Sequence, residues 1–177
     1  MAFDEGHQRR LKENSGRLLG FAFALTRDRD TAYDLLQESV VRAISAPSLP
    51  RDERAFRAWM FTTMRNLWID RLRSPQERTE AFSPEQELVC APLSMESLLV
   101  NKIAVRQAFE LLSADHREVL SLVDIGGFSY EEAAGMLGIP RGTVMSRVSR
   151  ARRALAAQLN ENTITAMPVA SRKVRNE

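Results

Sequence analysis

The chain has 177 residues, of which 44% are hydrophobic and 27% charged, a composition that excludes an intrinsically disordered protein. Its single cysteine excludes an internal disulfide bond, and no apolar run is long enough for a transmembrane helix. The net charge of +2 does not by itself indicate nucleic-acid binding. Because the first residues lack a signal-peptide pattern, we expect a cytoplasmic protein without membrane insertion.

The first predicted elements are two helices. Apolar residues within 18–25 predict a helix that ends in the polar turn 26–30. Asp30 or Thr31 is the expected N-cap of a second helix over about 31–45. Since no segment combines β-branched alternation with hairpin turn residues, the chain is predicted to be all-α.

The second predicted helix has an acidic outer face. Its outward positions are held by Asp34, Gln37, Glu38 and Val41. An acidic face with an exposed valine fits a protein-binding patch, but it also fits an ordinary solvated helix face. On these residues alone, the solvated face is the better interpretation.

A third helix, predicted over 53–73, interleaves aromatic and arginine residues. Its apolar side chains cover more than one face, which indicates burial or a partner on the second face. Aromatic rings among arginines can bind single-stranded nucleic acid by stacking on bases and holding the backbone. Trp59 is expected in the core, whereas Trp68, with Arg65 and Arg71 nearby, fits either role.

An acidic linker is predicted between two small helical domains. Residues 74–100 contain three prolines and five acidic residues against one basic residue, a composition typical of a flexible connection. Four further helices are predicted over about 95–112, 114–125, 130–137 and 140–158. The tail over 160–177 lacks periodicity, and we expect it to be disordered.

The most specific pattern is a helix-turn-helix. Ser129 and Glu132 form a capping box that predicts the start of a short helix. Gly138 ends this helix, and Pro140 suits the first position of the next one. The apolar stripe of the second helix is formed by Val144, Val148, Ala151 and Leu155, and its outer face by Ser146, Ser149, Arg150 and Arg153.

The outer face of the second helix points to DNA recognition. Arginine can donate paired hydrogen bonds to guanine edges or bind phosphates, and serine hydroxyls suit either target. A short helix, a tight turn and a basic outer face are the layout of a recognition helix in the major groove. A solvated basic surface helix is the alternative, and the capping box and turn make it the weaker one. A membrane-surface helix is disfavoured because aromatic residues are lacking.

No catalytic or metal site is predicted. His7 and His116 lie at no ligand-type spacing from Cys90. The sequence contains no Walker loop, dinucleotide-binding glycine motif or nucleophile elbow. We therefore expect a protein that is not an enzyme and that has no catalytic residues, metal or cofactor.

Taken together, the motifs resemble the extracytoplasmic-function sigma factors, group IV of the sigma-70 family of RNA polymerase subunits. The resemblance is carried by residues 34–38, 56–61, 65–73, 112–120, 129–134 and 138–147. It implies a region 2-like domain over 11–73, a linker over 74–100, a region 4-like helix-turn-helix domain over 101–159 and a tail after it. Such a protein binds core RNA polymerase and directs it to promoters.

The resemblance implies three binding surfaces. Asp34, Gln37, Glu38 and Val41 would bind the coiled-coil clamp of the largest polymerase subunit. The loop 46–54 would capture a flipped base of the −10 element, and Arg65, Asn66, Trp68, Arg71 and Arg73 would contact this single strand. Arg141, Thr143, Ser146, Arg147, Ser149, Arg150 and Arg153 would bind the duplex −35 element.

The resemblance also implies regulation. Members of the family are commonly sequestered by an anti-sigma factor, so we expect such a partner and a stress or envelope-response regulon. Met145 departs from the family pattern, which often has lysine there, so one phosphate contact is expected to be absent. No sensor domain is expected after Asn160.

Two further classes of protein remain as alternatives. An ordinary helix-turn-helix regulator would explain residues 129–155 but not the aromatic and arginine-rich helix over 53–73. A sigma mimic that titrates an anti-sigma factor is expected to lack DNA-facing arginines, whereas five arginines occur between 141 and 153.

Overall fold

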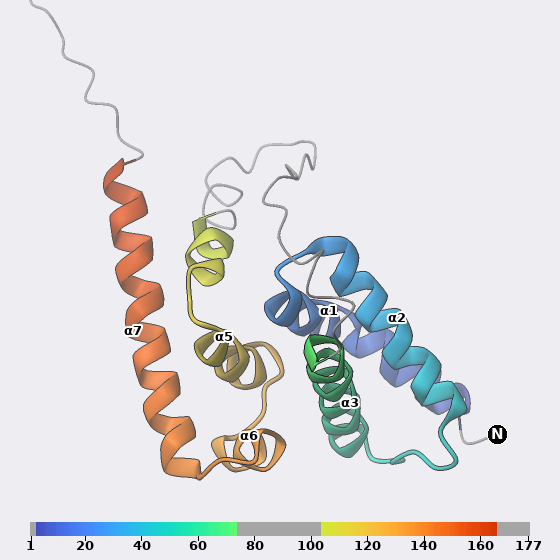
Figure 1. The fold of residues 1–177 in the computed structure, drawn as a ribbon. Coiled ribbons are helices and arrows are strands. Elements are labelled where there is room, and N and C mark those ends of the chain that lie inside the picture. The colour runs from blue at the N-terminus through green and yellow to red at the C-terminus, as the bar shows by residue number, and fades with distance from the viewer. Residues whose placement is uncertain (1–2, 74–103, 166–177) are drawn as a thin grey trace, which may run out of the picture.

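The computed structural model describes residues 3–73 and 104–165, and every regular element within these ranges is helical (Figure 1). The N-terminal domain consists of α1 (Glu5–Thr26), α2 (Arg29–Ser45) and α3 (Glu53–Arg73). The C-terminal domain contains a helical segment at 104–110, α5 (Ala114–Leu120), the π-helical turn η1 (Ser121–Ile125), α6 (Tyr130–Leu137) and α7 (Arg141–Thr165). The described residues confirm the all-α prediction. The predicted linker, over 74–100, lies outside them.

The turn between α1 and α2 is tighter than the sequence predicts. Only Arg27 and Asp28 separate the two helices, and Arg27 takes a left-handed conformation with φ 62° at the end of α1. Asp28 then caps α2, and its carboxylate accepts hydrogen bonds from the Thr31 amide at 2.8 Å and hydroxyl at 2.6 Å. The predicted N-cap at Asp30 or Thr31 is therefore wrong by two or three residues, because α2 begins at Arg29 and already includes Asp30.

The core of the N-terminal domain lies where its three helices meet. The fully buried large side chains there include Leu18, Phe21, Leu35, Phe56, Met60, Phe61 and Met64. Phe21 and Phe61 stack with ring centroids 4.6 Å apart, which ties α1 to α3. Since burying each such side chain contributes about 1.5–3 kcal/mol, this cluster fixes the relative placement of the helices that carry the predicted binding residues.

The predicted helix-turn-helix is present in the C-terminal domain. Ser129 and Glu132 form the capping box at the start of α6, and Gly138 ends α6 with φ 66°, a conformation that favours glycine. The apolar stripe of α7 faces inward, since Val144, Val148 and Ala151 are all buried. The sequence pattern therefore predicted both the two helices and the buried face of the second.

A π-helical turn ends the helix that begins with α5. The Gly126 amide donates to the Ser121 carbonyl at 2.8 Å, and Phe128 folds back against the turn. A Cβ at Gly126 would lie 2.7 Å from the Leu122 carbonyl oxygen and from the Phe128 ring. Because both neighbours are fixed, only glycine fits at this position.

Helix α7 is longer than expected. The sequence predicts irregular chain from Asn160, whereas the helix continues to Thr165. The physical reason is that residues 160–165 contain neither glycine nor proline, so nothing interrupts the hydrogen-bond ladder before Pro168. The remainder of the predicted tail, over 166–177, lies outside the described residues.

The two domains pack against each other (Figure 1): α5 and η1 contact α1, and ion pairs join α5 and α6 to α3. Arg117 is buried and donates from Nε to the Ala24 carbonyl of α1 at 3.1 Å, and from Nη1 to the Leu112 carbonyl. Phe61 of α3 meets Phe128 edge-on at 5.0 Å. The hydrophobic cores of the two domains are therefore continuous.

Candidate nucleic-acid and protein interfaces

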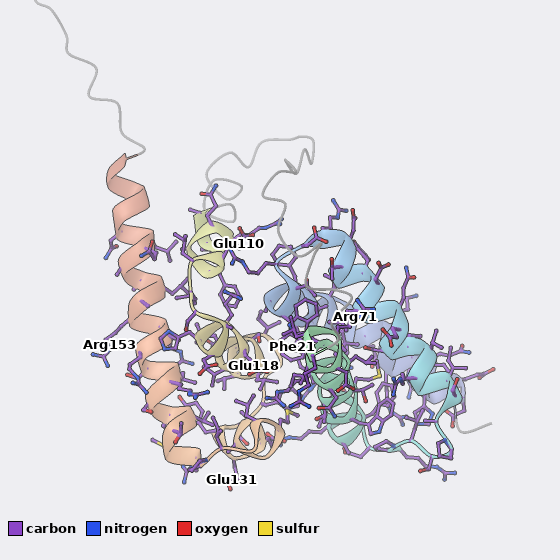
Figure 2. The ribbon with its side chains drawn as sticks, viewed as in Figure 1. Phe21, Arg71, Glu110, Glu118, Glu131 and Arg153 are labelled. Carbon is purple, nitrogen blue, oxygen red and sulfur yellow. The ribbon has the colours of Figure 1, made fainter. Side chains whose placement is uncertain are left out.

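The outer face of α7 carries the predicted −35 residues. Arg141, Ser146, Ser149, Arg150 and Arg153 are exposed, and Thr143 is half-buried at the start of the helix. Figure 2 shows Arg153 on the side of α7 that faces away from the rest of the protein. Since the opposite side holds the buried stripe, α7 presents its arginines and serines together to the outside, as insertion into a major groove requires.

Arg150 is held in place by its own helix. Its Nε donates to the Ser146 carbonyl at 3.2 Å, and its Nη2 lies 3.3 Å from the Ser146 hydroxyl. The side chain remains exposed, so the guanidinium is oriented without being covered. Arg153 donates similarly to the Ser149 carbonyl at 3.5 Å. Such ordering lowers the conformational entropy that is lost when the arginine binds a base or phosphate.

Two of the predicted −35 arginines form ion pairs within the domain. Arg147 is only 28% exposed and lies 3.0 Å from the Asp115 carboxylate at the start of α5. Arg141 lies 3.8 Å from Glu131 on α6, and both of these side chains are well exposed. Arg147 therefore braces α7 against α5, whereas Arg141 is free to exchange its partner for DNA.

The outer face of α2 is acidic and also more apolar than the sequence predicts. Asp34, Gln37 and Val41 are exposed, and Glu38 is partly exposed. Sequence reasoning missed two exposed members of this face, Tyr33 and Ile44. The Ile44 residue is 49% exposed, and Val41, which was predicted, is 60% exposed. Their spacing along one side of the helix was the available signal. A run of exposed apolar side chains among carboxylates is typical of a protein-binding surface.

Helix α3 places the predicted −10 residues in three different environments. Asn66 and Arg73 are exposed, and Trp68 is partly buried against the core. Arg71 donates from Nη2 to Glu38 of α2 at 2.7 Å, so it joins the two predicted binding faces of this domain. Trp59 also packs against the core, as the sequence predicts.

Arg65 faces the C-terminal domain rather than solvent. Its Nε donates to Glu118 of α5 at 2.7 Å, and each side chain is only about one-fifth exposed, 20% and 19%. Figure 2 shows Glu118 on the side of α5 nearest α3. Arg57, about two helical turns earlier, lies over the Phe128 ring at 5.4 Å. This face of α3 is therefore covered by the C-terminal domain in the present arrangement.

A second ion pair joins the domains at the helix-turn-helix. Arg54, at the start of α3, donates from Nε and Nη2 to the two carboxylate oxygens of Glu132, at 2.5 and 2.6 Å. Glu132 also accepts the Ser129 amide and hydroxyl at 2.8 Å each. The Arg54 hydrogen bonds, followed by those from Ser129, lower the pKa of Glu132 to about 2 against burial, which raises it. Sequence reasoning identified Glu132 as a cap but missed this pairing, because the two residues are 78 positions apart.

The lowered pKa of Glu132 predicts an acid-sensitive domain contact. Because its pKa in the folded protein lies below the ordinary value of 4.5, the carboxylate stabilises the structure above that pH and loses this contribution as pH falls towards 2. Between about pH 5 and about pH 3, the melting temperature of Glu132→Gln is expected to fall less steeply than that of the wild type. Glutamine keeps the capping box. The control is Glu131→Gln, an exposed neighbour, which should follow the wild type; equal slopes for all three proteins would contradict the prediction.

The described residues show neither a metal site nor a membrane span. Across residues 3–73 and 104–165, no three His, Cys, Asp or Glu side chains are arranged to hold a metal ion. Within the same ranges, none of the helices has the length and apolar character needed to cross a membrane.

Family models match both helical domains. The model described as Sigma-70 region 2 matches residues 11–79, and the model described as Sigma-70, region 4 matches residues 102–155. The first match spans most of α1 and all of α2 and α3, and the second spans the helix-turn-helix. They occur in the order that the sequence motifs predict.

Curated relatives extend across both domains. The ECF RNA polymerase sigma factor SigL of Mycobacterium tuberculosis is 36% identical over 160 residues, covering 86% of this chain and 88% of SigL. The ECF RNA polymerase sigma factor EcfG of Rhodopseudomonas palustris is 34% identical over 142 residues, covering 80% of this chain and 78% of EcfG.

Solved structures of similar proteins share the fold of this chain. The sigma factor RpoE of Bartonella quintana, solved in complex with the anti-sigma factor NepR, superposes with a TM-score of 0.65 at 31% identity, covering 86% of this chain and 96% of RpoE. CnrH, solved with the cytosolic domain of CnrY, has a TM-score of 0.60 at 23% identity and supports the fold alone. With relatives above 30% identity along most of its length and both domain models matched, the chain belongs to the extracytoplasmic-function sigma factors of the sigma-70 family.

Proposed function

We propose that this sigma factor binds core RNA polymerase through the outer face of α2 and directs it to promoters through α7 and α3. The single observation that carries the proposal is that the outer faces of α2 and α7 differ in their chemistry. One domain presents carboxylates and exposed apolar residues on α2, and the other presents exposed arginines and serines on α7. A protein surface and a duplex DNA surface on one chain are what a promoter-recognition subunit requires.

The −35 element is assigned to α7 as duplex DNA. The exposed residues Arg141, Ser146, Ser149, Arg150 and Arg153, together with Thr143, form this surface, and Arg147 supports it through Asp115. The −10 element is assigned to α3 and the preceding loop 46–52 as single-stranded DNA. Arg65, Asn66, Trp68, Arg71 and Arg73 are the proposed contacts, with Trp68 offering a ring for stacking.

Dependence on polymerase separates this function from that of an ordinary regulator. A sigma factor is expected to retard promoter DNA strongly only when core polymerase is present, whereas a helix-turn-helix regulator binds its duplex operator alone. A mobility-shift titration with and without core polymerase distinguishes the two. Equal retardation of duplex DNA without polymerase would contradict the proposal.

An anti-sigma factor is the proposed regulatory partner, in a stress or envelope response. The support is that RpoE of Bartonella quintana was solved in complex with the anti-sigma factor NepR, and that CnrH was solved in complex with the cytosolic domain of CnrY. The present chain shares their two-domain fold. Co-purification from the source organism with a small protein that blocks polymerase binding is the expected result.

When the two domains pack together as in this structure, an arrangement called closed below, Arg65 is not available to bind the −10 element. In this arrangement, the Glu118 carboxylate is paired with the Arg65 guanidinium, which would otherwise contact the −10 DNA strand. The two domains are therefore proposed to separate before the −10 element is bound.

Weakening the Arg65–Glu118 ion pair is expected to favour the open form. Glu118→Gln should raise the affinity of the free protein for single-stranded −10 DNA about fivefold, since a partly buried pair contributes on the order of 1 kcal/mol. Fluorescence anisotropy with a labelled strand measures this. Glu110→Gln, which removes an ion pair within the 104–110 helix, is the matched control. Unchanged affinity in Glu118→Gln would contradict the role of Glu118 as a competitor for Arg65.

A further inference from the structure

His7 is a buried polar residue that the binding surfaces described above do not use. Its side chain is only 2% exposed, at the start of α1. The ring lies edge-on to Phe56 of α3 at 5.4 Å and stacks on Phe3 at 5.9 Å. A buried imidazole must find hydrogen-bond partners, because an unpaired polar group in the interior is costly.

Each ring nitrogen of His7 has an oxygen partner. Nδ1 lies 2.6 Å from the carboxylate of Asp4, the N-cap of α1. Nε2 lies 3.2 Å from the carbonyl oxygen of Pro50, which is 43 residues away. The first contact belongs to the cap of α1, which the Asp4 carboxylate completes by accepting the His7 amide at 2.9 Å. Capping does not account for the second contact, because Pro50 belongs to another segment.

The segment that holds Pro50 is the loop between α2 and α3. It leaves α2 at Ala46 and enters α3 at Asp52, whose carboxylate accepts the Arg54 amide at 3.0 Å. Between these ends, Leu49 packs against the core, and the Pro50 carbonyl is tied to His7. Figure 1 shows the start of α1 beside this loop. The His7 hydrogen bond is thus a tether from a helix to the middle of an irregular segment.

We propose that His7 is a positioning residue that fixes the loop 46–52 in the conformation that selects a base of the −10 element. The inference rests on the proposed function, which assigns this loop to the −10 strand. A base pocket discriminates only when its backbone groups are held within a fraction of an ångström of the base edge. His7 touches no DNA itself and acts by donating from Nε2 to the Pro50 carbonyl.

Three substitutions distinguish the effect of losing the His7–Pro50 hydrogen bond from the effect of destabilising the start of α1. In His7→Asn, the amide can replace Nδ1 towards Asp4 but is too short to reach Pro50. In His7→Gln, the longer amide can replace Nε2 and keep the Pro50 hydrogen bond. In Asp4→Ala, the cap of α1 is lost while the Nε2 contact remains, so this variant reports the effect of destabilising the same helix end.

The experiment combines transcription with a structural readout, using the full chain and core RNA polymerase. Transcripts from a promoter library with a randomised −10 element are sequenced for each variant, and amide exchange is measured at Arg51 and Asp52. His7→Asn is expected to lower base discrimination at one −10 position to about one-third or less of the wild-type ratio, with faster exchange at both amides. Preference at the −35 element should be unchanged. His7→Gln should restore discrimination, and Asp4→Ala should keep it despite a lower melting temperature.

Several outcomes would overturn the inference. Wild-type discrimination in His7→Asn would show that the tether does not set base choice, and unchanged exchange at Arg51 and Asp52 would show that it does not order the loop. An equal loss of discrimination in Asp4→Ala would assign the effect to the helix end in general. Absence of sequence-selected transcripts with the wild-type chain would contradict the proposed function, and the inference with it.

Discussion

Arg150→Ala is expected to weaken binding of the polymerase complex to the duplex −35 element by about 1–3 kcal/mol, or about fivefold to about 150-fold. The reason is that Arg150 is exposed on the outer face of α7, and its guanidinium is oriented by Ser146. Binding of the protein to core polymerase should be unaffected, because α2 lies on the other domain. Competition assays with duplex −35 DNA at fixed salt measure the loss.

The same helix provides the control for Arg150. Arg152 is also exposed, at 51%, but its guanidinium binds the Asp124 carboxylate of η1 at 2.6 Å and faces away from the predicted DNA surface. Arg152→Ala removes the same charge from α7, so a purely long-range electrostatic effect would appear in both variants. We expect Arg152→Ala to retain most of the −35 affinity. Equal losses in the two variants would contradict the assignment of the outer face of α7 as the DNA-reading surface.

Asp34→Arg is expected to abolish detectable binding to core polymerase at micromolar concentrations. Reversing a charge at the centre of a charged interface costs several kcal/mol, because like charges are brought together and desolvated. Asp34 is exposed on the acidic and apolar face of α2, so the substitution should leave folding intact. Size-exclusion co-elution with core polymerase measures binding, and circular dichroism reports the helical content.

Charge reversal elsewhere on the same domain tests whether the α2 face is specific. Glu13 is an exposed carboxylate on α1 and forms only a long ion pair with Arg9, at 4.0 Å. Glu13→Arg changes the net charge by the same amount and is expected to keep polymerase binding. Retained binding in Asp34→Arg, or a comparable loss in Glu13→Arg, would contradict the assignment of the outer face of α2 as the polymerase-binding surface.

Local patterns in the sequence predicted the helices and their buried faces well. The capping box at Ser129, the glycine at 138 and the apolar stripe of α7 all act within a few residues of each other, so spacing alone reveals them. The inward and outward sides of α2 followed from the same periodicity. Asp28 and Asp30 are both suitable N-caps for α2, and the tight turn after α1 places Asp28 in that position. The length of this turn could not be read from the sequence.

Contacts between distant segments could not be predicted. The ion pairs of Arg54 with Glu132 and of Arg65 with Glu118 join residues 78 and 53 positions apart. No periodicity encodes such pairs, because they depend on how the two domains pack. The same holds for His7, which the sequence brought into the argument only to exclude a metal site, whereas its contact with the Pro50 carbonyl joins residues 43 positions apart. Sequence reasoning therefore predicted the exposed faces of α2 and α7, but not the contacts that cover or order neighbouring residues.

Run-off transcription with purified core RNA polymerase, with and without this protein, tests the central claim most directly. The templates are genomic promoter fragments from the source organism, and Asp34→Arg serves as the negative control. Discrete transcripts that appear only with the wild-type protein, and disappear with Asp34→Arg, are the predicted result. The absence of protein-dependent transcripts, together with tight binding to duplex DNA without polymerase, would contradict promoter recognition as a polymerase subunit.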